Sequence, residues 1–390
     1  MGAINSKIYR DIWSHKSRTL QVVMIIAIGA AALGLIVGTR NLVVPGMQNQ
    51  WRSAHPAMIN LFITPSISQD DLDVLRKEDG VVQVEGLGST AIEWRTDPSE
   101  EWKAGGINFR ADYNNQTLNH LEQVEGDWPS GNQASISQGD DSFFKIPKNG
   151  TVYIRFEDKE YTLHTRGVVY NMLQQPAYFG GTAQFFISQD EYERITDDPD
   201  FNQALITGVK YDEVQTAELA DRVQKRIEKM GSDSTRFITD PNKHFFQDSL
   251  DGLFYLLGIL GALALVLGLL LVYITINAII TQQVDQIGIM KAIGARTGQI
   301  LRLYISGIFV YSFLAMLIAV PLGVFGAWSV SAWLISSFGS NPGPFQYSME
   351  AVWTMLIIVY VAPMLAALIP IFNGARITVD GGYTINTRNS

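Results

Sequence analysis

The sequence contains no cysteine among its 390 residues. Without cysteine, the chain can form no disulfide, no thiolate metal site, no cysteine nucleophile and no lipid-modified cysteine. Any large water-exposed domain must therefore be held together by its own hydrophobic core. A segment of roughly 200 residues is long enough to bury such a core.

The sequence also lacks the motifs of several common kinds of site. No G-x-x-x-x-G-K-[ST] loop, H-E-x-x-H pair or G-x-S-x-G turn occurs. Five histidines are scattered singly, and ordinary surface or core positions explain them better than metal binding: His15, His55, His120, His164 and His244. We therefore expect no catalytic residue, no metal and no cofactor in this chain, and a membrane-anchored enzyme is the weakest interpretation.

Charge is missing from four long windows of the sequence. They are residues 20–39, 252–284, 303–349 and 351–372. A hydrocarbon layer about 30 Å thick needs about 20 apolar residues in a helix, and a charge at the centre of a span costs about 2.5–3.5 kcal/mol. We predict four transmembrane helices. The first window is too long for a signal-peptide core, and no small-x-small cleavage site follows it, which favours a retained span over a cleaved signal.

The charges that the chain does have are unevenly distributed. Residues 45–250 contain 33 acidic and 19 basic residues, whereas the rest of the chain has 5 acidic and 10 basic residues. This asymmetry indicates a basic membrane part joined to an acidic, water-exposed domain. No ionisable residue lies at the centre of a span, which argues against an ion-coupled transporter.

Basic residues also predict the orientation of the spans. They lie before the first span and between the second and third spans, as Lys7, Arg10, Lys16, Arg18, Lys291, Arg296 and Arg302. The positive-inside rule places both termini and the segment 283–300 in the cytoplasm, and the acidic domain outside the cell membrane. Residues 6–20 alternate apolar and basic side chains, which favours a helix lying in the inner membrane interface over a simple basic flank.

The acidic domain shows alternating strand and helix patterns. Strand-like runs cover residues 57–64, 80–86, 151–156, 161–171, 182–188, 204–212 and 235–239. Helices are predicted after Ser68, after Ser188 and over residues 213–231, the last ending at Gly231. We expect an α+β domain of two subdomains, in which a β-rich insertion over residues 90–180 is flanked by two similar strand–helix–strand units. This pattern is compatible with an internal duplication.

Two features of the predicted spans bear on packing and stiffness. Glycines recur in the first three spans and permit close helix approach, although general span composition explains them equally well. No strong helix breaker follows Pro241, so we predict a continuous helix from Pro241 to Ile280, which forms a stiff stalk between the outer domain and the membrane.

The segment from Gln283 to Ile300, QVDQIGIMKAIGARTGQI, lies between two charge-free windows. Ile287, Met290 and Ile293 recur at a spacing of three, with Ile289 beside them, and glycines flank them. This pattern predicts a short amphipathic helix suited to anchoring in the interface or to docking in a groove of a soluble protein. Because the chain has no nucleotide site, this segment is the place where an energy source could attach.

The run DQIGIMKAIGARTGQI resembles the E-I-G-I-x-[KR]-A-[IL]-G-A-x-x-x-Q-I signature of the FtsX-like permeases. These are membrane subunits of ABC transporters of the macrolide-exporter (MacB) and lipoprotein-release type. The order of one span, a large domain and three spans agrees with that family, as do the basic stretch RDIWSHKSRTL and the first-span run IAIGAAALG.

The resemblance implies a permease that pairs with a second copy or a similar permease and docks on a separate ATPase dimer. That ATPase would bind ATP and Mg, with none bound in this chain. It implies export or extraction of an amphiphile by mechanotransmission, with a periplasmic adaptor as a further possible partner and no nucleic acid. The implied coupling helix comprises Asp285, Ile287, Gly288, Ile289, Met290, Lys291, Ala292, Ile293, Gly294, Ala295 and Arg296.

The sequence departs from the family pattern at three places. Gln286 stands where the family usually has glutamate, and Thr281, Gln282 and Gln283 stand where it has arginines. We expect a less ionic contact with the ATPase as a result. The tail after the fourth span keeps only Ala375 and Arg376 of the family's tail motif.

The predicted fold is an α-helical membrane protein with four transmembrane helices and a large α+β extracytoplasmic domain inserted between the first and second spans. An alternative function for the same architecture is a signalling complex that activates an extracytoplasmic hydrolase or sensor. The predicted parts are the interfacial helix 1–19, span 20–44, outer domain 45–240, stalk and span 241–282, coupling helix 283–300, span 301–336, outer loop 337–350, span 351–373 and cytoplasmic tail 374–390.

Overall fold

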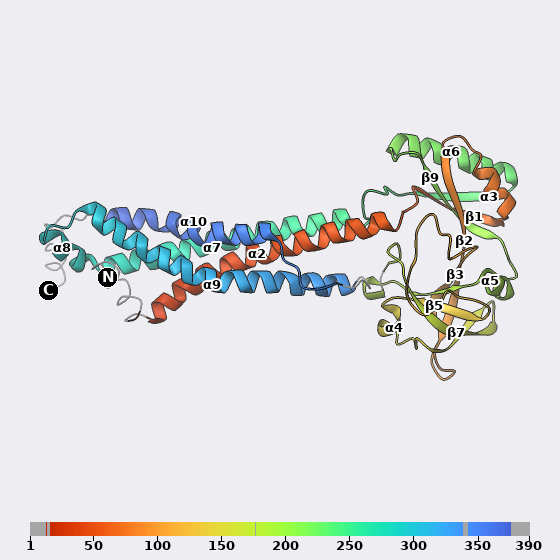
Figure 1. Ribbon diagram of the computed structural model, residues 1–390, viewed down its shortest axis with the longest axis horizontal. Helices are drawn as coiled ribbons and strands as arrows, with labels where there is room; N and C mark the ends of the chain where they lie inside the picture. The colour runs from red at the N-terminus through yellow and green to blue at the C-terminus, as the bar shows by residue number, and fades with distance from the viewer. Residues whose placement is uncertain (1–12, 14–15, 176, 338–341, 376–390) are drawn as a thin grey trace. The chain divides into compact units, whose positions relative to one another are not determined.

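The computed structural model describes residue 13 and residues 16–175, 177–337 and 342–375. The chain forms two compact units, each described here by itself (Figure 1). The helical unit comprises residues 1–43, 249–331 and 343–390, and the sheet unit comprises residues 44–248 and 332–342. Most of the predicted interfacial helix and nearly all of the predicted tail lie outside the described residues.

Within the described residues, four helices are long and apolar enough to cross a membrane. They are α2 (Lys16–Ser53), α7 (Gln247–Gln282), α9 (Thr297–Ser337) and α10 (Met349–Ala375). Each charge-free window therefore contains one long helix, as predicted, although α9 ends at Ser337 and α10 begins only at Met349. Helix α2 continues through Pro45 to Ser53, nine residues beyond the predicted end of the first span at residue 44.

The predicted helix from Pro241 begins later in the structure, at Gln247. The N–H group of Asn242 donates to the Asp240 carboxylate at 2.8 Å, and the N–H of Phe246 donates to His244 Nδ1 at 3.1 Å. Such side-chain bonds offer the backbone an alternative to helix. The continuous helix that we predict from Pro241 is therefore wrong for its first six residues, which form turns.

Glycines allow close helix packing in the helical unit at some predicted positions only. The side chain of Met355 in α10 is fully buried and occupies the space where a Cβ on Gly34 or Gly323 would lie. Gly261 and Gly326 likewise face leucine side chains of α2, whereas Gly29, Gly258 and Gly268 have open space where a Cβ would lie. Close approach thus explains the first four glycines, and general span composition explains the last three.

Polar contacts near one end of the helical unit join α2 to two other helices. The Asn41 amide donates to Ser348 Oγ at 3.0 Å and to Glu350 Oε2 at 2.7 Å. Arg40 lies 3.4 Å from Asp251 of α7. Exposed ion pairs contribute roughly 0–1 kcal/mol to the free energy of unfolding. These contacts therefore fix the position of α2 along its neighbouring helices more than they stabilise the unit.

Ten strands of the sheet unit form one mixed sheet in the order β10-β1-β9-β2-β3-β8-β5-β7-β4, with β6 paired to β2 and β7. The β3–β8 and β5–β7 pairs are parallel and the others are antiparallel. The strands are β1 (Ile59–Ile67), β2 (Val81–Arg95), β3 (Lys103–Arg110), β4 (Glu122–Glu125), β5 (Gln133–Ser137), β6 (Gly150–Phe156), β7 (Lys159–Tyr170), β8 (Ala183–Ile187), β9 (Phe201–Gly208) and β10 (Asp233–Ile238).

The first four strands of that order contain two interleaved strand–helix–strand units. One is β1, α3 (Gln69–Leu75) and β2, and the other is β9, α6 (Glu213–Met230) and β10. In each strand–helix–strand motif, the two strands are not neighbours in the sheet, and a strand of the other motif lies between them. Strand β9 lies between β1 and β2, and β1 lies between β9 and β10. This is the split βαβ arrangement. The two units that look alike in sequence therefore also have equivalent places in the sheet.

Local sequence signals set the ends of the helices in this unit. Ser68 and Asp71 form the predicted type of capping box at the start of α3. Ser188 accepts the N–H of Glu191 at the start of α5 (Gln189–Thr196), and Asp212 caps α6 in the same way. Gly231 ends α6 with φ +96°, a left-handed conformation that favours glycine.

Sequence patterns do not reveal β3, β4, β5 or the short helix α4 (Asp140–Phe143). Strand β3 contains two glycines, and β5 alternates alanine and isoleucine with two buried serines. Glycine and serine are weak strand formers, so these strands depend on pairing with neighbours on both sides. One cluster of buried side chains runs from Met58 to Ile227 through the whole sheet unit.

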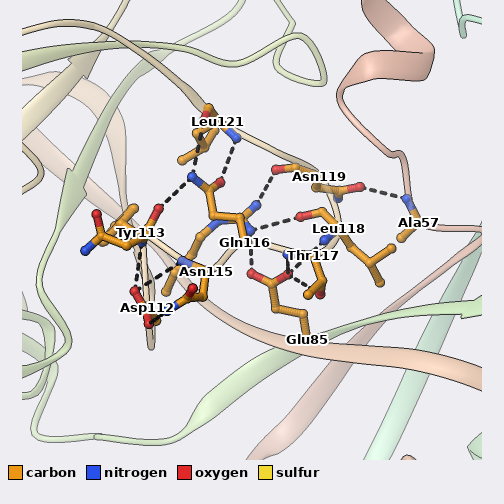
Figure 2. Close-up of polar contacts among 12 residues, drawn as sticks. Ala57, Glu85, Asp112, Tyr113, Asn115, Gln116, Thr117, Leu118, Asn119 and Leu121 are labelled. Atoms are coloured by element: carbon orange, nitrogen blue, oxygen red, sulfur yellow. Dashed lines mark hydrogen bonds and ion pairs between the residues drawn. The ribbon is translucent and has the colours of Figure 1, made fainter.

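Hydrogen bonds to Glu85 hold the loop of residues 112–121 against the sheet (Figure 2), and the same carboxylate forms a buried ion pair with Arg110. Arg110 and Glu85 lie 2.5 Å apart and are both largely buried. The second Glu85 oxygen accepts the N–H groups of Thr117 and Leu118, each at 2.9 Å. Asn119 Oδ1 in turn accepts the N–H of Ala57 at 2.8 Å. The loop is thereby joined to the segment that follows α2.

We predict that Gly323→Leu destabilises the helical unit, because the added side chain overlaps Met355. Overpacking of this kind costs about 1–3 kcal/mol. Thermal unfolding of the detergent-solubilised chain should show a midpoint several degrees lower. Gly258→Leu is the matched control and should leave the midpoint unchanged, since its Cβ meets open space. Equal effects of the two substitutions would contradict this packing.

We further predict that Glu85→Ala loosens the loop of residues 112–121. Removing one partner of a buried ion pair costs about 3–5 kcal/mol, because the other charge stays buried. Hydrogen exchange measured by mass spectrometry should become faster in that loop. Asp73→Ala removes the exposed partner of Arg76 and should change exchange little. Unchanged protection of the loop in Glu85→Ala would show that the ion pair does not hold it.

Candidate functional site

The predicted coupling segment contains a short helix, α8 (Val284–Ala292), which directly follows α7. It is shorter than the predicted segment 283–300, because α9 already begins at Thr297. Two tight turns therefore bound α8, one at Gln283 and one over residues 293–296. The helix lies in the helical unit.

Gly294 ends α8 in a Schellman motif. Its φ is +98°, its N–H donates to the Lys291 carbonyl at 2.9 Å, and the N–H of Ala295 donates to the Met290 carbonyl at 2.9 Å. These are the two bonds of that motif. Arg296 then precedes α9, and its N–H donates to Gln299 Oε1 at 2.9 Å. Gly294 thus serves the backbone turn, since a Cβ there would meet no neighbour but would be strained.

The start of α8 is held by two glutamines. Gln283 is buried and its Oε1 accepts the hydroxyl of Tyr304 in α9 at 2.8 Å. Gln282 Oε1 accepts from Arg18 NH1 of α2 at 3.2 Å. These are two of the positions where the chain departs from the arginines of the related family pattern. Their amides join α7 to α9 and α2, a role that the sequence pattern does not indicate.

One face of α8 packs into the helical unit. Ile287 is fully buried in a cluster with Ile280 of α7 and Ile371 of α10, and Met290 and Ala295 are partly buried against the same cluster. A side chain buried in this way anchors α8 within the helical unit. Contact of Ile287 with a soluble partner stays a prediction.

The opposite face of α8 is exposed and partly apolar. Ile289 is 60 % exposed and Ile293 is 82 % exposed. Asp285, Ala292, Gly294 and Arg296 are also exposed, while Gly288 and Lys291 are half-buried. The sequence pattern groups all the isoleucines on one face, but the structure divides them between two. We call Ile289 and Ile293, with Asp285 and Arg296 beside them, the outer face of α8.

Outside this segment, burial shifts the pKa values of several titratable groups. Burial raises the pKa of Asp140 to about 7 and lowers the pKa of His244 to about 4. Burial also raises the pKa of Tyr113, whose hydroxyl donates to the Ile187 carbonyl at 2.8 Å. Among the described residues, no three His, Asp or Glu side chains are grouped as metal ligands.

Comparison with known proteins gives one family match. Residues 258–379 match the family described as FtsX-like permease C-terminal. No curated protein matches the chain. Among the solved structures that are similar to part of it are two domains of ABC-type transporters. The extracellular domain of the noncanonic ABC-type transporter YknZ from Gram-positive bacteria has 14 % identity and a TM-score of 0.33, and 47 % of this chain covers 99 % of that one.

The second structure is the periplasmic region of MacB from Actinobacillus actinomycetemcomitans, with 10 % identity and a TM-score of 0.32. The similarity covers 47 % of this chain and 88 % of the MacB chain. The family match spans most of α7 and all of α8, α9 and α10. By this match, residues 258–379 are similar to the C-terminal region of FtsX-like permeases, and α8 lies within the matched residues.

Proposed function

We propose that the chain is the membrane subunit of an ABC transporter and that a separate ATPase docks on the outer face of α8. The observation that carries this proposal is the exposure of Ile289 and Ile293 on a short helix between two long apolar helices. Exposed isoleucines flanked by charges fit an apolar groove on a soluble partner. The family match supplies the class of partner.

The contacts at the start of α8 support transmission of motion from the ATPase. The N–H of Gln283 donates to the carbonyls of both Ile279 and Ile280, at 3.1 and 3.0 Å. Helix α7 continues from there without interruption for 36 residues, about 54 Å at 1.5 Å per residue. A displacement of α8 would therefore move α7 as a rod. In this proposal the chain hydrolyses no ATP itself.

Within the sheet unit, aromatic rings join the end of α2 to the segment just before α7. Trp51, near the end of α2, packs against His244 and Phe245 with ring centroids 4.9 and 5.7 Å apart. His244 and Phe245 immediately precede α7. The end of α2 and the start of α7 are thus joined within one aromatic cluster, so neither helix end moves alone.

The remaining parts of the proposal follow from charge and family. The positive-inside rule supports cytoplasmic termini and an extracytoplasmic sheet unit in the cell membrane. A pair of permeases, identical or similar, would engage the two subunits of an ATPase dimer that holds ATP and Mg. In this proposal the transporter exports or extracts an amphiphile by mechanotransmission.

We predict that Ile289→Asp combined with Ile293→Asp abolishes association with the ATPase. Two carboxylates on the outer face would have to be desolvated in the partner's groove, which is unfavourable without a cationic partner. The measurement is affinity purification of the tagged chain from membranes, with mass spectrometry of the proteins that accompany it. Membrane fractionation should show normal insertion, since neither isoleucine is buried.

Val209→Asp is the matched control, because Val209 is 88 % exposed in the sheet unit. It should leave the ATPase bound. Retained ATPase in the double variant would show that the outer face is not the docking site. Absence of any ATPase from the unmodified chain would contradict the proposed function as a whole.

A further inference from the structure

A cavity of about 410 Å³ lies in the sheet unit between β1, β10 and the segments next to α2 and α7. Asn60 of β1 and Phe237 of β10, which line it, are direct cross-strand partners. Ile59 and Leu61 pack on the core beside α6, so alternation directs Asn60 to the opposite face of the sheet. The cavity thus lies on the face that α3 and α6 do not cover.

Two buried polar atoms of residues that line this cavity have no hydrogen-bond partner among the described residues. They are Asn60 Oδ1, an acceptor, and Trp51 Nε1, a donor. Buried polar groups in proteins are nearly always paired, and exceptions call for an explanation. A ligand that offers both a donor and an acceptor would pair both atoms. An amide group has this composition.

Aromatic rings form the apolar part of the lining. Phe237 is 64 % exposed and Phe245 is 45 % exposed, and both line the cavity. Phe237 lies on the edge strand β10. Exposure of its apolar ring to water is unfavourable, and a bound ligand that covered the ring would remove this cost. Cavities of about 300–1,000 Å³ with apolar walls and a few polar groups are typical of small-molecule sites.

The charged residues of the lining disfavour an anion. Lys243 and Asp248 form an ion pair at 2.7 Å. His244 is neutral at pH 7, since burial lowers its pKa to about 4. Asp240 remains as an additional negative charge, with its carboxylate accepting from Asn242. The lining therefore carries a net negative charge, which suits an uncharged or cationic ligand.

We propose that this cavity binds the polar end of an uncharged or cationic amphiphile that carries amide groups. Asn60 Oδ1 accepts from the amide, Trp51 Nε1 donates to it, and Phe237 and Phe245 contact an apolar side group. The inference rests on the proposed function, for which it names the class of substrate. Because Trp51 belongs to α2 and Asp248 to α7, a bound ligand contacts the ends of both helices.

The test uses the full chain in lipid nanodiscs without an ATPase, with empty nanodiscs as the blank. Three dipeptides with the same side chains serve as probes in calorimetric titrations. They are leucyl-phenylalanine amide, which is cationic, N-acetyl-leucyl-phenylalanine amide, which is neutral, and N-acetyl-leucyl-phenylalanine, which is anionic. We expect saturable binding of the first two and at least tenfold weaker binding of the third.

Asn60→Leu removes the unpaired acceptor and should weaken binding of the neutral probe at least tenfold. Phe237→Ala should weaken it at least fivefold, and this exposed edge position keeps the test valid if Asn60→Leu does not fold. Asn114→Leu changes an exposed asparagine away from the cavity and is the matched control. Circular dichroism verifies that each variant is folded.

Three results would overturn the proposal. They are no saturable binding above the blank, equal affinity for the anionic probe, and unchanged affinity in both cavity variants. Because the titration contains no ATPase, its failure leaves the proposed docking on α8 intact. Conversely, dipeptide binding by a chain that associates with no ATPase would contradict the transporter and support the cavity alone.

Discussion

The structure depends first on one constraint, the lack of hydrogen-bond partners for the backbone in a hydrocarbon layer. Only a segment that pairs its own N–H and C=O groups can cross such a layer, and a helix does so within one stretch of chain. Four apolar helices satisfy this requirement here. Desolvation in the same layer disfavours charge at the centres of those helices, so most polar chemistry is left to the helix ends, the sheet unit and the short connections. Helix α8 is one such connection, and Ile289 and Ile293 stay exposed there beside the charged Asp285 and Arg296.

Packing among the helices explains why α8 is held in place at all. Met355 fills the space left by Gly34 and Gly323, so α2, α9 and α10 meet closely. Ile287 inserts into the cluster that these helices and α7 form, and Gln283 bonds to Tyr304 at the adjoining turn. A nine-residue helix has little stability of its own. Its conformation follows from this anchoring and from the Schellman turn at Gly294, so its outer face is presented in one orientation.

Features that depend on neighbouring residues in the chain were predictable from sequence. The four spans, the caps at Ser68 and Ser188 and the end of α6 at Gly231 all agree with local patterns. Features that depend on distant residues were not. Strands β3 and β5 have weak propensity and exist through their partners, and the helical wheel of α8 could not show which isoleucines meet α10. The turn at His244 also replaced a predicted helix, because a side chain took the backbone N–H group. The cavity needed β1, β10, α2 and α7 together, and no local pattern contains it.

Trp51 lies where the end of α2 meets the segment that precedes α7. Trp51 contacts His244 and Phe245 and also lines the cavity. Any change in the relation between the end of α2 and the start of α7 must therefore alter that cavity, since the same rings form its wall and the contact between the segments. Helix α7 is continuous from this joint to the turn at which α8 begins. By the reciprocity of linked equilibria, a ligand whose binding depends on the position of Trp51 would bias the relation between these two segments by the same free energy as that relation biases its binding.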